Sequence, residues 1–151
     1  MSVRHILAFS RDDKGVAALE FGLIAPLLIA IAVCTVDLGM GFYQNMQVQN
    51  AAQAGATYAS LHGFAATGIS NAVLSATDVS GLTVSPAPAQ ACGCPSSAGI
   101  VWTDCSMQCS GGASPGTYVT VGAQATYNTL LPYPGVPQSF TLSAQTVVRI
   151  H

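Results

Sequence analysis

The stretch KGVAALEFGLIAPLLIAIAVCTVDLGMGFY, residues Lys14–Tyr43, decides the fold of this chain. No residue in Phe21–Val36 is charged, and the longer apolar run around it is interrupted only by Glu20 and Asp37. A helix over the uncharged residues alone would be about 24 Å long, and one over residues 16–43 about 42 Å, whereas the hydrocarbon core of a bilayer is about 30 Å thick. The stretch therefore predicts a single transmembrane helix at 16–43, in contact with membrane lipid.

Basic residues lie almost entirely on one side of this stretch. Arg4, Arg11 and Lys14 lie at or before its start, whereas Arg149 alone follows it. Because positive charge is retained in the cytoplasm, the N-terminus is predicted to be cytoplasmic and residues 44–151 to form a domain on the opposite side of the membrane.

The composition excludes one large class of function. Of 151 residues, 50% are hydrophobic and 7% are charged, and the formal net charge is −2. A typical soluble domain carries about 25% charged residues. With so few basic side chains the chain lacks the positive patch that nucleic-acid binding requires, so no nucleic-acid partner is predicted. The length allows one domain beyond the membrane helix.

Glu20 lies inside the apolar run, where an ionisable side chain is by default functional and needs a partner. The residues around it, GVAALEF from Gly15 to Phe21, resemble the processing site of type IV prepilins. There a short charged leader ends in glycine, and a glutamate is the fifth residue of the mature chain. With an aromatic residue after the glutamate and Pro26 soon afterwards, the pattern looks most like the TadE/TadG-type pseudopilins of the bacterial tight-adherence (Tad) pilus system.

The resemblance implies specific roles for these residues. Residues 1–15 would be the leader, a prepilin peptidase would cleave between Gly15 and Val16, and Glu20 and Phe21 would act in assembly. Glu20 would pair with the terminal amine of a neighbouring subunit, because a carboxylate and an ammonium attract more strongly in a medium of low dielectric constant than in water. The alternative is an uncleaved signal anchor whose Glu20 extends to the membrane interface.

The resemblance also implies where the protein works and with what. The chain would reside in the bacterial inner membrane, with its C-terminal domain in the periplasm, and would act with other pilin or pseudopilin subunits and the pilus assembly machinery. Residence in the membrane complex and entry into the extracellular pilus are both compatible with the sequence.

The residues after the membrane stretch predict an α+β domain. The helix is expected to continue beyond Gln44, because small and apolar residues recur at helical spacing: Val48, Ala51, Ala52, Gly55, Tyr58 and Ala59. A second short helix capped by Thr67 and a short strand at 82–84 are expected next. Alternating apolar residues predict strands at 118–127 and 140–150, paired antiparallel with one face against the long helix, as in type IV pilins.

A segment rich in Gly, Ser, Pro and Cys, residues 86–116, is predicted to be a loop with a strand only at Ile100–Trp102. A loop this long needs a constraint, and it contains four cysteines, Cys92, Cys94, Cys105 and Cys109.

Two disulfides are predicted among these cysteines, because the proposed compartment is oxidising and each crosslink would contribute about 2–4 kcal/mol. A bond between the first two would close a very tight loop, so each of them is expected to pair with one of the last two, in either arrangement. A zinc site is the alternative, although C-x-C with C-x3-C differs from the usual zinc knuckles.

No catalytic or metal-binding set is evident elsewhere. His5, His62 and His151 are scattered, and Asp78 and Asp104 lie far apart in segments that resemble turns or loops. The sequence therefore predicts a protein that is not an enzyme and has no cofactor. The leading hypothesis is a minor pilin or pseudopilin of a Tad-type adhesive pilus; the alternative is an uncleaved bitopic envelope protein whose outer domain binds a protein partner.

Overall fold

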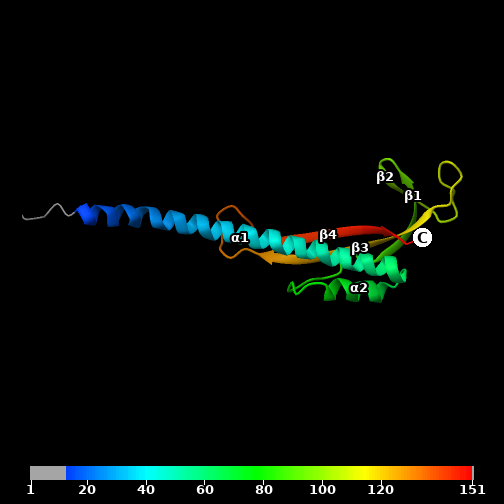
Figure 1. The fold of residues 1–151 in the computed structure, drawn as a ribbon, viewed down its shortest axis with the longest axis horizontal. Coiled ribbons are helices and arrows are strands. Elements are labelled where there is room, and N and C mark those ends of the chain that lie inside the picture. The colour runs from blue at the N-terminus through cyan, green and yellow to red at the C-terminus, as the bar shows by residue number, and fades with distance from the viewer. Residues whose placement is uncertain (1–12, 151) are drawn as a thin grey trace, which may run out of the picture. The chain divides into compact units, whose positions relative to one another are not determined.

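The computed structural model describes residues 13–150 of the chain (Figure 1). The predicted leader, 1–15, therefore lies mostly outside the described residues. The fold is α+β and pilin-like, since a long apolar N-terminal helix precedes a small antiparallel sheet domain. The elements are α1 (Asp13–His62), α2 (Ala66–Ser75), β1 (Ala89–Ser96), β2 (Gly99–Thr103), β3 (Gly116–Asn128) and β4 (Ser139–Arg149). They form two compact units that divide between Gly39 and Met40.

The first unit consists of the apolar part of α1. Leu27, Leu28 and Ile29 point in directions about 100° apart around a helix, yet their side chains are 62%, 54% and 63% exposed. Apolar side chains are thus exposed on all sides of the helix, which favours an apolar surrounding. Among the described residues, α1 is the one helix long and apolar enough to cross a membrane.

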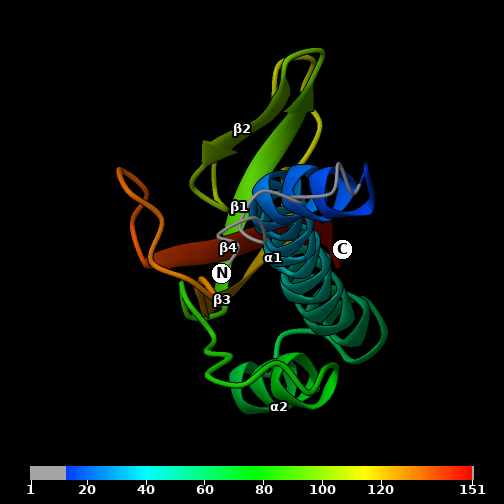
Figure 2. The same ribbon diagram turned by 90° about the vertical axis from the view of Figure 1, so that its left-hand side faces the viewer.

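The second unit is organised around the remainder of α1. The predicted stripe of small residues is confirmed, because its members are buried or half-buried: Val48, Ala51, Ala52, Gly55, Tyr58 and Ala59. This face packs on buried side chains of β3, and α2 adds Ile69 and Val73, which are both fully buried. Figures 1 and 2 show α2 and the β1–β2 hairpin on opposite sides of α1.

The sheet has the strand order β2-β1-β3-β4, with every neighbouring pair antiparallel. The predicted pairing of the last two strands is confirmed, with a register that runs from Tyr118↔Arg149 to Asn128↔Ser139. The predicted alternation in β3 is also confirmed, because one face of this strand is buried: Val119, Val121, Ala123, Ala125 and Tyr127.

The strand predicted at Ile100–Trp102 within the segment 86–116 is confirmed as β2, but the rest of this segment is not all loop. It contains the hairpin β1–β2, in which β1 pairs with β2 on one side and with β3 on the other. The sequence of β1, AQACGCPS, has no β-branched or aromatic residue and includes Gly93 and Pro95, so its local preference for a strand is weak. Its strand conformation comes from pairing with β2 on one side and with the more distant β3 on the other.

Two smaller predictions were also wrong. Thr67 does not cap α2, since the cap residue is Ala65 and no side chain hydrogen-bonds to this helix end. The strand expected at 82–84 is reduced to one bridge, in which Thr83 pairs with Gln124 and their backbone N–H groups donate to each other's carbonyl oxygens at 2.7 and 2.8 Å.

Candidate functional site

The predicted processing and assembly residues lie close to the beginning of α1. Gly15 and Val16 are both helical and exposed, and an added Cβ at Gly15 would meet no atom within 4 Å. Glu20 follows Val16 by four residues, which is about one helical turn, so the two residues lie on the same face about 6 Å apart along the axis. The structure thus places the proposed new N-terminus and the carboxylate on one side of the helix.

Glu20 is exposed within this apolar surface, and the adjacent Phe21 side chain is 68% exposed. Among residues 15–150, whose side chains are described, none forms an ion pair or a hydrogen bond with Glu20. In an apolar environment an ionised carboxylate without a partner is costly, and an amine is the group that would offset this cost.

The four cysteines of 86–116 form two disulfides, Cys92–Cys105 and Cys94–Cys109, with Cα–Cα distances of 5.1 and 5.5 Å. Cys92 and Cys94 are two residues apart in β1, so their side chains point to the same face of the strand. Both bonds therefore hold the segment after β2 against one face of the hairpin. Because the sulfur atoms are bonded to each other, they are not available as thiolate ligands for zinc.

The hairpin carries an aromatic contact that the sequence did not predict. The ring of Trp102, which is 50% exposed, meets the buried ring of Tyr118 edge to face at 5.9 Å between centroids. Gly93 of β1 pairs with Trp102 of β2, and an added Cβ at Gly93 would lie 2.5 Å from Ile100 Cγ2. The hairpin is therefore closely packed in spite of its weak strand sequence.

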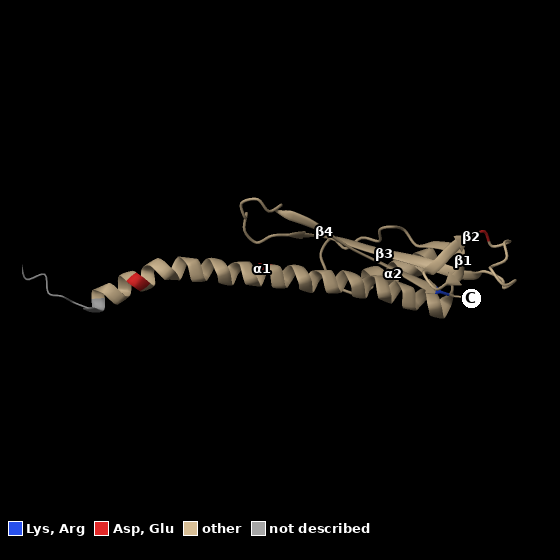
Figure 3. Ribbon diagram, turned by 90° about the horizontal axis from the view of Figure 1, so that it is seen from above, with Lys and Arg blue, Asp and Glu red and all other residues tan. Residues whose placement is uncertain are grey.

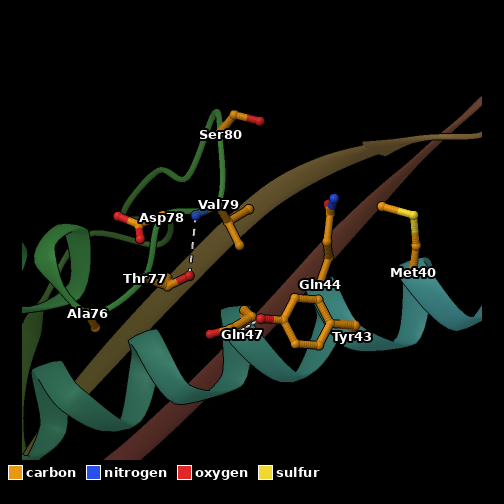
Figure 4. A pocket seen from close by; sticks show the side chains of 9 residues that line it. All are labelled: Met40, Tyr43, Gln44, Gln47, Ala76, Thr77, Asp78, Val79 and Ser80. Atoms are coloured by element: carbon orange, nitrogen blue, oxygen red, sulfur yellow. Dashed lines mark hydrogen bonds between the residues drawn. The ribbon is translucent and has the colours of Figure 1, made fainter.

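A shallow cleft of about 420 Å³ separates α1 from the segment after α2 (Figure 4). Asp78 provides its one charged side chain, and the remaining lining is neutral: Met40, Tyr43, Gln44, Gln47, Ala76, Thr77, Val79 and Ser80. The Tyr43 hydroxyl accepts a hydrogen bond from the Gln47 amide, and Thr77 Oγ1 accepts one from the Val79 N–H. This lining holds no nucleophile–base pair, so the cleft offers no catalytic set.

Charged residues are sparse along the ribbon in Figure 3. No three His, Cys, Asp or Glu residues in the described range are arranged to hold a metal ion. Asp37 is buried to 3% exposure and is engaged in an interaction, although its neighbours Val36 and Leu38 are 55% and 61% exposed. Its burial could not be inferred from the sequence, where it lies at the end of the apolar run.

An exposed apolar N-terminal helix followed by a small disulfide-linked α+β domain defines the class of the fold, which is pilin-like. Residues 15–57 match the family model described as TadE-like protein. The matched segment includes Gly15, Val16, Glu20 and Phe21, and it ends within the buried stripe of α1. No curated protein and no solved structure gives a match to the chain. This segment of the chain is thus similar to TadE-like proteins.

Proposed function

We propose that this chain is a minor pilin or pseudopilin, a structural subunit that takes part in the assembly of a Tad-type adhesive pilus. The observation that supports the proposal most strongly is the coincidence of the TadE-like match, residues 15–57, with the exposed apolar helix and its carboxylate. In this role the protein binds other subunits and the assembly machinery and carries out no reaction itself.

The first step is removal of residues 1–15 by a prepilin peptidase. Gly15 is exposed and its surroundings are open, so an enzyme can approach it. Glycine is also about 1 kcal/mol less favourable than alanine inside a helix, which lowers the cost of extending the chain at this point for cleavage. Cleavage creates a positively charged amine on Val16.

The second step is pairing between that amine and Glu20 of a neighbouring subunit. Within an apolar environment the attraction between the two charges is strong, and loss of one partner of a buried pair costs about 3–5 kcal/mol. The pair would align two helices along their lengths, because each subunit carries one amine and one carboxylate a single turn apart. We expect Glu20→Gln to preserve membrane insertion and to reduce assembly, with Asp78→Asn as the matched control.

The proposed topology places the N-terminus in the cytoplasm and the second unit in the periplasm. Two disulfides in the second unit support this orientation, because such bonds form and persist in oxidising compartments. The three basic residues at positions 4, 11 and 14 support it independently.

The deciding experiment is the intact mass and the N-terminal sequence of the chain recovered from membranes of a host that carries the matching peptidase. We expect the recovered chain to begin at Val16. The matched controls are a host without active peptidase and the variant Gly15→Leu, which should both retain residues 1–15. A full-length chain in the competent host would favour the alternative, an uncleaved bitopic envelope protein whose outer domain binds a protein partner.

A further inference from the structure

The outer side of β4 is the longer of the two open edges of the sheet. β4 spans Ser139–Arg149 and pairs on one side with β3, whereas the opposite edge strand, β2, spans only Gly99–Thr103. Short edge strands, charged side chains and prolines protect sheet edges from further pairing. Between Ser139 and Val148 β4 has no charged residue and no proline.

The hydrogen bonds at the two ends of β4 determine which backbone groups face outward. The Ile150 N–H donates to Thr117 O at 2.9 Å, and the Thr129 N–H donates to Gln138 O at 2.9 Å. In an antiparallel pair, the backbone N–H and C=O groups of successive residues point alternately toward the partner strand and away from it. The even-numbered residues of β4 therefore bond to β3, and the outward N–H and C=O groups belong to odd-numbered residues, Ser139, Thr141, Ser143, Gln145 and Val147.

The side chains beside this edge are also incompletely covered. Leu142, Ala144 and Val148 pack against the core but are only half-buried, whereas their partners in β3 are fully or almost fully buried. Within residues 13–150, no hydrogen bond from another element reaches the backbone groups of Thr141, Ser143, Gln145 and Val147. An added strand would cover this row of half-buried apolar side chains and would also form hydrogen bonds with the outward backbone groups.

We propose that the outer edge of β4 binds an extended segment of a different protein chain as a fifth, antiparallel strand. This segment carries apolar side chains opposite the even-numbered residues of β4, where they cover Leu142, Ala144 and Val148. Its central residues are uncharged, because β4 offers no opposite charge there. The inference goes beyond the proposed function and does not depend on cleavage after Gly15.

A second copy of this chain that presents its own β4 edge is a poorer occupant. Within the second unit, Gly41 lies beside Tyr127 and Gly55 beside Val121, so α1 runs antiparallel to β3 and in the same direction as β4. Two copies with their α1 helices in the same direction would present β4 edges in parallel. A parallel ladder is less stable, and it would bring the two Arg149 side chains toward each other.

The probe is a fluorescent peptide with the sequence TYVTVGAQAT, copied from residues 117–126, which already pairs with the inner edge of β4. We expect saturable binding to the full-length chain in detergent micelles. A control peptide with lysine in place of both valines should bind at least about tenfold more weakly, because its charges would lie against the apolar row.

Amide hydrogen exchange, resolved by NMR, then locates the peptide. Saturating peptide should slow exchange at Thr141, Ser143 and Gln145 by at least about tenfold, and leave Leu142 and Ala144 unchanged, because their amides already bond to β3. Absence of binding, or slowing without this odd-numbered pattern, would overturn the proposal. If exchange at the odd-numbered amides is already slow without peptide, and becomes slower as the protein concentration rises, the edge binds a second copy. That result would also overturn the proposal.

Substitution of Ser143 tests the backbone bond directly. Ser143→Pro removes an outward N–H and leaves the bonds to β3 in place, so the fold should be retained and peptide binding should weaken about tenfold. Ser143→Val, which keeps the N–H, should bind like the unmodified chain. Equal binding by a folded Ser143→Pro would contradict the proposal, and if that variant does not fold, the exchange pattern of the unmodified chain decides.

Discussion

The packing around Gly55 leaves little room for a side chain, and Gly55→Ala tests this directly. An added Cβ would lie 2.5 Å from Val73 Cγ2 and 2.8 Å from Val121 Cγ1, which are closer than real Cβ contacts. Both valines are fully buried, one in α2 and one in β3, so neither can turn into solvent. Alanine is thus expected to force α1, α2 and β3 apart at this point.

The magnitude follows from two opposing terms. Alanine gains about 1 kcal/mol over glycine inside a helix, whereas overpacking a dense core costs about 1–3 kcal/mol. Because two side chains from different elements must move, we take the upper part of the overpacking cost. Subtracting the helix gain leaves a net loss of about 1–2 kcal/mol in the free energy of unfolding. For a domain of this size each kcal/mol lowers Tm by about 4–8 °C.

The assay is thermal unfolding in detergent micelles, followed by the near-UV circular dichroism of the Trp102–Tyr118 pair. Gly39→Ala is the matched control, because it is also on α1 and an added Cβ there would meet no atom within 4 Å. We expect this control to keep or slightly raise Tm. A Tm for Gly55→Ala equal to or above that of the unmodified chain would refute the reasoning.

Three further results are expected. Alkylation of the unfolded chain without reduction should label one cysteine and, after reduction, all five, and a higher first count would contradict the two disulfides. The double variant Cys94→Ala/Cys109→Ala should lower the free energy of unfolding by about 3 kcal/mol, measured with urea, since the bonded residues are 15 apart. Gly122→Ala should cost about 1–3 kcal/mol in the same assay, because its Cβ would meet the backbone of Pro86, and an unchanged midpoint would exclude that contact.

The sequence predicted those elements whose burial follows a regular spacing. The stripe after Gln44 and the alternation in β3 were recognisable because one side of each element is buried in the same core. The strand β1 was not, since Gly93 and Pro95 oppose a strand locally and one of its two partners, β3, is distant in sequence. In physical terms, periodic burial is encoded locally, whereas strand pairing depends on the whole fold.

The candidate site likewise has one part that the sequence predicted and another part that it did not. Gly15 and Glu20 could be selected from the short motif GVAALEF, because it resembles the processing site of type IV prepilins. The pairing of the disulfides could not be selected, because it depends on how β1 positions Cys92 and Cys94 relative to the segment after β2. The outward-facing groups of β4 required the register of the sheet.

The core of the second unit draws its fully buried side chains from α1, α2 and β3, with none from β1 or β2. The hairpin is instead secured by its own two covalent bonds. Exposed side chains of the hairpin can therefore change without loss of contacts among the fully buried side chains of the core. The turn after Ser96, which joins the two strands of the hairpin away from the core, is accordingly the natural position for inserting an epitope tag.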